Sequence, residues 1–269
     1  MTVVLIVLLA LFLCLLFLVA PAVRRHPDRK VIKGLYIAHR GLHDIDKDTP
    51  ENSLAAFAAA VARGYAIEND IHVTADGAVV VFHDNNLKRM CGVDVNIEES
   101  TLSELRKYTL LDTNEHIPTL KECLDLVDGR VPLLIEFKSQ SFENSRKLCE
   151  AADEILKDYN GKYFIQSFYP PVLLWYRKNR EEICRGQLST AFKGEHISKR
   201  LLGFLLFNFL SRPDFVSYDI NFSNSIMFNI TKLLGALPVG WTFRKQTEFD
   251  SKRKNFKAYI FELFIPDKK

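Results

Sequence analysis

The chain has 269 residues, of which 48% are hydrophobic and 26% charged, a composition typical of a globular protein with one large core. Its 36 basic and 33 acidic residues leave a formal net charge of +3, which argues against a nucleic-acid partner because such partners usually need a concentrated basic face. The five cysteines are scattered and never form a C-x-x-C pair. This spacing argues against a disulfide framework and a zinc site, and favours free thiols in a reducing compartment.

The N-terminal segment is a candidate membrane span. Residues 2–23 carry no charge and consist mainly of Leu, Val, Ile, Phe and Ala. As a helix, this segment would rise about 33 Å, enough to cross the hydrocarbon core of a bilayer. We therefore predict a transmembrane anchor over residues 1–23. A cleaved signal peptide is the alternative, because residues 19–22 loosely resemble a processing site, but no basic residue precedes the apolar run.

A basic linker follows over residues 24–34, with cations at Arg24, Arg25, Arg29, Lys30 and Lys33. By the positive-inside tendency, this flank stays in the cytoplasm. We therefore expect a single-pass protein of the cell membrane whose remaining domain, residues 35–269, is cytoplasmic. The sequence leaves the oligomeric state open.

From residue 35 onward, short apolar runs alternate with helical patterns. The predicted strands are Leu35–His39, Ala66–Val73, Val79–His83, Pro132–Lys138, Tyr163–Phe168, Arg185–Ser189, Phe215–Ile220, Pro238–Phe243 and Ala258–Phe264. The predicted helices are Ser53–Arg63, Ser103–Tyr108, Leu120–Val127, Glu143–Asp158, Pro171–Lys178, Lys199–Leu210 and Ser225–Leu234. Ser53 suits the N-cap of the first of these helices and Gly64 its C′ position.

If the third strand folds back on the second through the turn at Asp76-Gly77, eight strands remain to alternate with helices. That pattern favours a closed (β/α)₈ barrel, the TIM barrel of the α/β class, over an open sheet.

Charged side chains gather where the predicted strands end, which is where such barrels carry their active sites. His39-Arg40 end the first strand and His83 ends the hairpin. Glu68 and Asp70 on the second strand, and Glu136 and Lys138 on the next, are spaced i, i+2. This spacing directs both side chains of each pair to one face.

These residue types suit phosphodiester chemistry. Glu68, Asp70 and Glu136 offer hard oxygen ligands for one divalent cation, Mg²⁺ or Ca²⁺, which would also offset their mutual repulsion. Arg40 and Lys138 can bind a phosphate through charge-assisted hydrogen bonds. The imidazoles of two histidines can take up and give a proton near neutral pH.

The ordered motifs resemble those of the glycerophosphodiester phosphodiesterases, in the bacterial type that carries an N-terminal anchor. The matching segments are His39-Arg40-Gly41, Thr49–Ser53, Ile67–Ile71, Thr74–Gly77, Val81–Asp84, Leu134–Lys138, Gln166–Phe168 and Gly240–Thr242. A single His-Arg or His-Asp pair is weak evidence for a family, but the ordered set of motifs spans about residues 35 to 243.

The resemblance implies metal-dependent hydrolysis of glycerophosphodiesters to sn-glycerol 3-phosphate and an alcohol. In that family a neighbouring glycerol hydroxyl attacks phosphorus, the alcohol leaves, and water opens the cyclic phosphate. The matching positions make His39 and His83 the general base and acid, and Glu68, Asp70 and Glu136 the metal ligands. By the same match, Arg40, Glu51, Lys138 and Trp241 bind the substrate and its phosphate.

Two alternatives remain open for the activity. The anchor would suit hydrolysis of membrane lysophospholipids in the manner of a lysophospholipase D. A barrel that binds lipid or phosphate without turnover is the other. The family's closing Thr-Asp or Thr-Asn motif is replaced here by Phe261-Glu262, so contacts from the last strand are in question.

Several of these residues also fit simpler structural roles. Glu51 can serve as a first-turn carboxylate, and Trp241 as a core aromatic. Structural roles are expected for His43, His72, His116 and His196. The apolar run 201–210 is too short to span a bilayer, and either packs as a buried barrel helix or lies in the membrane interface.

Overall fold

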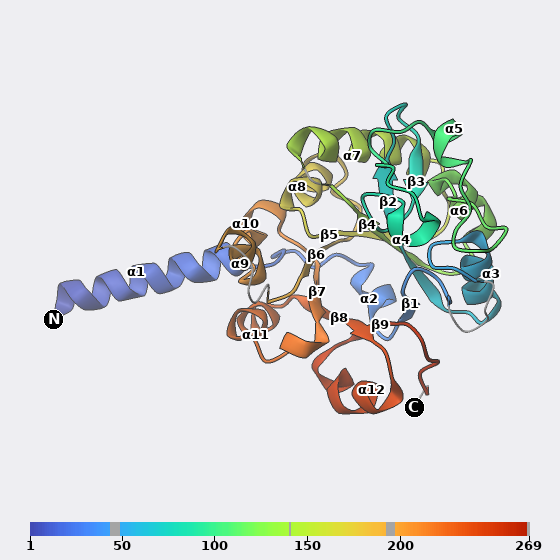
Figure 1. The fold of residues 1–269 in the computed structure, drawn as a ribbon. Helices are drawn as coiled ribbons and strands as arrows, with labels where there is room; N and C mark the ends of the chain where they lie inside the picture. The colour runs from blue at the N-terminus through green and yellow to red at the C-terminus, as the bar shows by residue number, and fades with distance from the viewer. Residues whose placement is uncertain (44–48, 140, 192–196, 268–269) are drawn as a thin grey trace.

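The computed structural model describes residues 1–43, 49–139, 141–191 and 197–267, and shows the predicted TIM barrel (Figure 1). Eight parallel strands close it, because β1 pairs with both β2 and β9. Their bounds are β1 Tyr36–Ala38, β2 Ala66–Val73, β4 Leu133–Phe137, β5 Tyr163–Ser167, β6 Arg185–Ser189, β7 Phe215–Asp219, β8 Leu237–Phe243 and β9 Ala258–Phe261.

The ninth strand, β3 (Val79–Val81), forms the predicted hairpin. It runs antiparallel to the end of β2, with Val80 opposite His72. This pairing removes β3 from the barrel wall and carries the following residues, including His83, back across its mouth.

The α-helices lie around the barrel wall, except for the first, which extends away from the barrel, and the second, which packs at its N-terminal end. They are α1 Thr2–Val19, α2 Arg29–Ile32, α3 Leu54–Ala62, α4 Lys88–Cys91, α5 Leu102–Leu105, α6 Leu120–Val127, α7 Phe142–Leu156, α8 Pro170–Asn179, α9 Ile197–Gly203, α10 Asn208–Ser211, α11 Ile226–Leu233 and α12 Gln246–Lys252. The predicted cap of α3 is confirmed, since the Ser53 hydroxyl accepts from the Ala56 amide at 3.1 Å. Gly64 follows with φ +67°, the left-handed conformation that suits a C′ glycine.

The single helix predicted over residues 199–210 needs correction. Residues 199–210 form two short helices, α9 and α10, because the chain turns after Gly203 and Leu205 adopts a left-handed φ of +59°. Helices α2, α4 and α12 were not predicted. Helix α12 is short and mostly polar, and only Phe249 of it is buried, so it shows little hydrophobic periodicity.

The barrel interior changes from apolar to charged along its axis. At the N-terminal end, a buried cluster of inward residues includes Leu134, Phe164 and Ile260, and Ile32 of α2 packs against them. Two residues further along the same strands, the inward positions are Glu136 and Gln166. Apolar side chains therefore form the core at the N-terminal end of the barrel. Polar side chains lie towards its C-terminal end, where such barrels carry their active sites.

Helix α1 extends away from the side of the barrel that carries α9, α10 and α11 (Figure 1). It is long and apolar enough to span a membrane, and only 6% of it is buried against the barrel. The chain therefore carries an N-terminal helix that fits either an anchor or a signal sequence.

Candidate active site

An acidic cluster lies inside the C-terminal end of the barrel. Glu68 and Asp70 extend inward from β2, and Glu136 extends from β4, where it is paired in register with Asp70. One oxygen from each carboxylate lies within 4.8 Å of the others, and all three residues are buried. The structure thus brings together three carboxylates from two neighbouring strands. Glu68 and Asp70 lie on one face of β2, as their i, i+2 spacing predicts.

Three buried carboxylates resist simultaneous ionisation. Burial, followed by repulsion from Asp70, raises the pKa of Glu68 well above its ordinary value. Burial raises the pKa of Glu136 to about 7. Burial also opposes ionisation of Asp70, but Lys138 and neighbouring cationic groups outweigh it and lower the pKa of Asp70. A divalent cation fits this donor set, because it would neutralise hard oxygen ligands that burial penalises.

Lys138 already balances part of this negative charge. Its Nζ lies 2.6 Å from Glu136 Oε1 and 3.0 Å from Asp70 Oδ1. The ammonium and the carboxylates therefore share one small volume, which is the arrangement needed to hold an anionic phosphate beside a metal.

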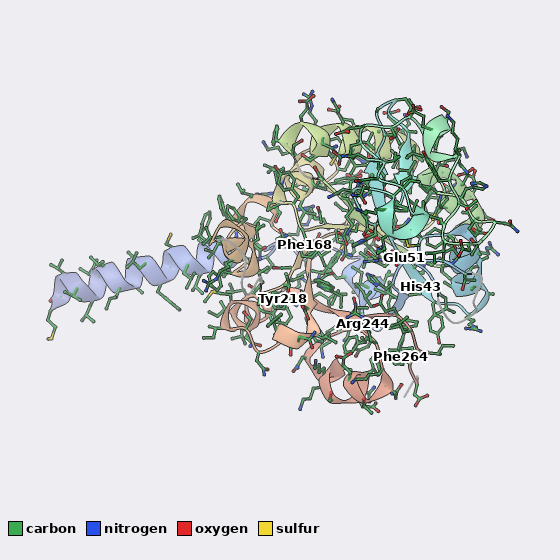
Figure 2. The ribbon with its side chains drawn as sticks, viewed as in Figure 1. His43, Glu51, Phe168, Tyr218, Arg244 and Phe264 are labelled. Atoms are coloured by element: carbon green, nitrogen blue, oxygen red, sulfur yellow. The ribbon has the colours of Figure 1, made fainter. Side chains whose placement is uncertain are left out.

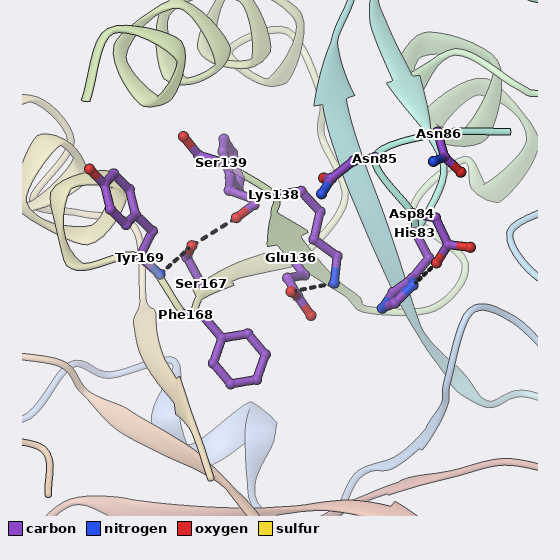
Figure 3. Close-up of a pocket in the computed structure, with 11 residues that line it drawn as sticks. His83, Asp84, Asn85, Asn86, Glu136, Lys138, Ser139, Ser167, Phe168 and Tyr169 are labelled. Atoms are coloured by element: carbon purple, nitrogen blue, oxygen red, sulfur yellow. Dashed lines mark hydrogen bonds and ion pairs between the residues drawn. The ribbon is translucent and has the colours of Figure 1, made fainter. Parts of the chain in front are cut away.

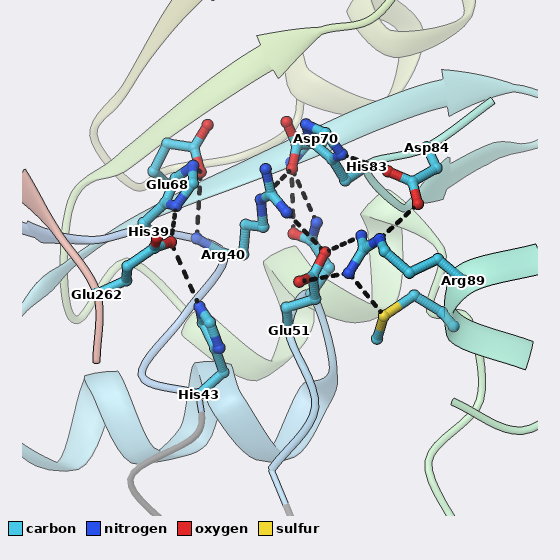
Figure 4. A network of polar contacts seen from close by, with 12 residues as sticks. His39, Arg40, His43, Glu51, Glu68, Asp70, His83, Asp84, Arg89 and Glu262 are labelled. Carbon is cyan, nitrogen blue, oxygen red and sulfur yellow. Dashed lines mark hydrogen bonds and ion pairs between the residues drawn. The ribbon is translucent and has the colours of Figure 1, made fainter. Parts of the chain in front are cut away.

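His39 follows β1, and its Nδ1 forms a hydrogen bond with Glu262, the residue after β9 (Figure 4). Burial opposes ionisation of Glu262, but hydrogen bonds from His39 and His43 outweigh it and lower its pKa well below the ordinary range. An ionised carboxylate only accepts hydrogen bonds, so Nδ1 carries the proton. The other ring nitrogen, Nε2, lies 3.9 Å from Glu68 and keeps its lone pair.

His83 is oriented in the same manner from the opposite side of the cluster. Its Nδ1 lies 2.6 Å from Asp84 Oδ1, and Asp84 in turn accepts from Nε of Arg89 at 2.7 Å. Burial is the largest cause that lowers the pKa of His83, to about 4. Both imidazoles are thus held through Nδ1 by a carboxylate, which leaves Nε2 available for chemistry.

Glu51 lies between two guanidinium groups. Its Oε1 is 2.7 Å from Arg40 Nη1 and 2.6 Å from Arg89 Nη2. Arg40 also places Nε 3.4 Å from Asp70. Glu51 therefore holds Arg40, the cation predicted to bind phosphate, which in turn reaches Asp70 of the acidic cluster.

The turn that carries Arg40 requires unusual backbone conformations. Arg40 has φ +55° and Asn52 has φ +57°, and the Asn52 amide donates to the Arg40 carbonyl at 2.9 Å. Asn52 Nδ2 also donates to Asp70 at 2.9 Å. At Gly41, φ +81°, an added Cβ would lie 2.8 Å from Ala56, so only glycine fits there.

A cavity of about 480 Å³ opens beside this network (Figure 3). Its lining includes His83, Glu136, Lys138 and Phe168. Trp241 lies next to Phe168 of the cavity lining. The two rings make an edge-to-face contact with a centroid distance of 5.6 Å. In the whole-molecule view, Phe168, Glu51 and Arg244 lie around the middle of the barrel (Figure 2).

The predicted catalytic, metal and phosphate residues therefore lie around one network, with Trp241 at its edge. Sequence reasoning gave no role to Arg89 or Glu262, and it placed Asn52 and Gln166 in matching segments without assigning them a role. Gln166 donates to Glu68 at 3.3 Å. His43, expected to be structural, has its Nε2 3.8 Å from Glu262. His196 lies outside the described residues.

Comparison with known families gives a match over most of the chain. The Glycerophosphoryl diester phosphodiesterase family matches residues 39–258. Lysophospholipase D GDPD1 of Rattus norvegicus is 33% identical over 161 residues, 55% of this chain and 49% of the relative. Glycerophosphodiester phosphodiesterase of Caldanaerobacter subterraneus is 38% identical over 116 residues, 40% of this chain and 46% of the relative. The chain spans about half the length of these relatives, which include mammalian and bacterial proteins.

Solved structures share the fold over a longer span. An Oleispira antarctica phosphodiesterase in complex with the product sn-glycerol-3-phosphate has a TM-score of 0.72 and 22% identity, covering 87% of this chain and 94% of that one. A glycerophosphodiester phosphodiesterase of Thermotoga maritima has a TM-score of 0.66 and 25% identity, covering 84% and 94%.

Proposed function

Since the chain belongs to the glycerophosphoryl diester phosphodiesterase family, we propose that it hydrolyses glycerophosphodiesters to sn-glycerol 3-phosphate and an alcohol. One observation carries the proposal. The acidic cluster of Glu68, Asp70 and Glu136 lies with a carboxylate-held imidazole on either side, beside a cavity that also exposes Lys138. A site that only bound phosphate would need the cations but not the two oriented imidazoles.

Glu68, Asp70 and Glu136 would hold one divalent cation, Mg²⁺ or Ca²⁺. When bound, it would polarise a phosphoryl oxygen and make the attacking hydroxyl more acidic. Gln166 keeps the carboxylate of Glu68 in place, and Asn52 does the same for Asp70. Arg40 and Lys138 bind the non-bridging phosphate oxygens, because both present cationic donors next to the cluster.

The two imidazoles divide the proton transfers. His39 is neutral in the free site, because burial lowers its pKa, and Nε2 is positioned to take the proton of the glycerol hydroxyl that attacks phosphorus. His83 gives a proton to the oxygen of the leaving alcohol. Burial also keeps His83 neutral in the free site, so its protonated form depends on the negative charge of the bound phosphodiester. Water then opens the cyclic phosphate with the roles reversed.

Trp241 and Phe168 form the apolar side of the substrate site. Their edge-to-face contact offers a surface for the carbon atoms of the glycerol or of the departing alcohol. We place Trp241 behind Phe168, so it orients this surface instead of contacting the phosphate.

The anchor favours a second substrate class. Residues 1–23 would span the cell membrane and residues 24–34 would connect them to the enzyme domain, 35–269. The cations after the span favour a cytoplasmic domain, and the five cysteines are all free thiols, as a reducing compartment requires. Lysophospholipids in the same bilayer are then available to the site, and some relatives carry the name lysophospholipase D.

A product assay on the purified chain tests the proposal. Glycerophosphocholine, glycerophosphoglycerol and a lysophospholipid are supplied separately, and sn-glycerol 3-phosphate and lysophosphatidic acid are measured. Release of sn-glycerol 3-phosphate from the first two supports the proposed reaction. Lysophosphatidic acid alone would favour the lysophospholipase D activity. Binding of these compounds without release of any product would contradict the proposed hydrolysis and favour a barrel that binds lipid or phosphate without turnover.

A further inference from the structure

The end of α1 is fixed firmly to the barrel. Val19 is wholly buried, and its carbonyl accepts from Asn208 Nδ2 at 3.0 Å. Arg212 Nη1 donates to the carbonyls of Phe17 at 2.9 Å and Ala20 at 3.0 Å. The Arg212 guanidinium also lies over the Phe17 ring, 4.5 Å from its centroid. Thr231 of α11 also donates to the Val19 carbonyl, at 3.5 Å, so both α10 and α11 are joined to the end of α1.

Helix α11, which packs on α1, has an apolar outer face. Ile226 is 72% exposed and Leu233 is 87% exposed, and the half-buried Ile230 lies between them at the i, i+4, i+7 spacing of one helix face. Phe228 and Thr231 are buried on the inner side. A helix that faces water normally carries polar residues on its outer side, so this face needs a cover.

The apolar run 201–210 continues that surface on the other side of α1. Phe204 is exposed, and Phe207 and Phe209 are half-buried. The Phe209 ring lies 6.1 Å from the Phe17 ring of α1. We name Phe204, Phe207, Phe209, Ile226, Ile230 and Leu233 the apolar collar.

Cations border the collar. Arg24, Arg25, Arg177 and Arg212 line a depression at the base of α1. Arg177 and Arg212 donate hydrogen bonds to backbone carbonyls. A carbonyl carries no formal charge, so these bonds do not neutralise the two guanidinium groups. Acids line the same depression: Asp28 is paired with Lys162, Glu182 is paired with Arg180, Asp214 accepts from the Arg185 amide at 3.1 Å, and Glu181 lies beside them. Arginines next to an apolar surface match the phosphates and acyl chains of a lipid monolayer.

We propose that the apolar collar is seated in the boundary between headgroups and acyl chains of the bilayer that α1 crosses, with the bordering arginines at the level of the phosphates. The inference rests on the proposed span of α1. The occupant is lipid because α1 is fixed to both elements of the collar, so its insertion brings the collar to the bilayer surface. This assigns the run 201–210 to the membrane interface.

Quenching of tryptophan fluorescence in the full chain tests whether the apolar collar lies in the bilayer. Ile226→Trp and Leu233→Trp place reporters on the collar, and Phe12→Trp places one inside the span. Leu111→Trp is the matched control, because Leu111 is an exposed leucine between α5 and α6, which lie across the barrel from α1 (Figure 1). Each variant is reconstituted in phosphatidylcholine–phosphatidylglycerol vesicles with and without brominated acyl chains. Emission is compared with that of the parent chain, which contains Trp175 and Trp241.

We expect both collar reporters to lose most of their added emission in brominated vesicles, as Phe12→Trp does, while Leu111→Trp keeps its emission. Quenching of Phe12→Trp alone would overturn the collar and leave the anchor in place. If Phe12→Trp also stayed bright, both the span and the collar would be wrong. Glycerophosphocholine hydrolysis, measured in parallel, separates these outcomes from a failure of the proposed activity.

Discussion

His39 and Glu262 extend from β1 and β9, the two strands that close the barrel, and their side chains form a hydrogen bond across that seam. Ala38 and Phe261, the preceding residues, are paired in register. Closure of the barrel therefore brings together the proposed base and its carboxylate, although 223 positions separate them in sequence.

Glu262→Gln tests this pair. We expect kcat to fall at least tenfold, towards the loss of about 10²–10⁴-fold expected for losing a general base, because His39 loses the charge that fixes its proton on Nδ1. The hydrogen bond with Glu262 raises the pKa of His39, so its removal should move the acidic limb of kcat/KM to lower pH. Arg244→Gln, which removes only an outer partner of Glu262, is the control and should leave that limb in place. If the acidic limb of kcat/KM did not shift in Glu262→Gln, the proposed effect of Glu262 on the pKa of His39 would be contradicted.

The choice of leaving group separates the two histidines. His83→Ala should lose about 10²–10⁴-fold in kcat on glycerophosphocholine, but much less on a glycerophosphodiester of p-nitrophenol, which leaves without protonation. His39→Ala should be slow on both substrates, because the attacking hydroxyl still has to lose its proton. Equal losses of His83→Ala on the two substrates would remove its role as the acid.

Metal binding should stabilise the chain more as pH rises. The pKa of Glu136 is about 7 in the folded chain against 4.5 ordinarily, so the folded state binds more protons between these values. Its contribution to the free energy of unfolding therefore falls as pH increases through that window. Since a cation binds the ionised carboxylates, the rise in Tm with Mg²⁺ or Ca²⁺ should be larger at pH 8 than at pH 5.5.

Glu136→Gln is the matched variant for that measurement. It removes one ligand and one of the two carboxylates whose pKa burial raises, so the metal-dependent rise in Tm should shrink, and the pH dependence that remains should come from Glu68. A rise in Tm that did not depend on pH in the parent chain would contradict the assignment.

Gly41→Ala should destabilise the fold more than Gly77→Ala. Both glycines have φ above +80°, and a non-glycine residue there costs about 1–3 kcal/mol of strain. At Gly41 the added Cβ would also lie 2.8 Å from Ala56, whereas nothing lies within 4 Å at Gly77. Urea unfolding of the two variants measures the difference, and equal midpoints would show that the close packing at Gly41 has no energetic weight.

The sequence predicted those parts of the structure that depend on local patterns. The strands β2 and β6 have the predicted bounds, because each is a continuous stretch between turn signals. Glu68, Asp70 and Glu136 could be placed together because register and alternation fix where strand residues point.

The missed residues depend on contacts between distant segments. Glu262 lies where the family resemblance fails, and only the pairing of β9 with β1 brings it to His39. Arg89 lies on the four-residue helix α4, and its pairing with Glu51 and Asp84 joins segments from two different loops. A single sequence holds no signal for either contact.

The most direct test is the rate of glycerophosphocholine hydrolysis by the purified full chain after removal of metal with EDTA, followed by titration with Mg²⁺ or Ca²⁺. The account predicts that hydrolysis stops without metal, returns in a saturable manner, and does not return in Glu68→Gln. Undiminished release of sn-glycerol 3-phosphate in EDTA, or full recovery in Glu68→Gln, would contradict a metal site formed by these carboxylates.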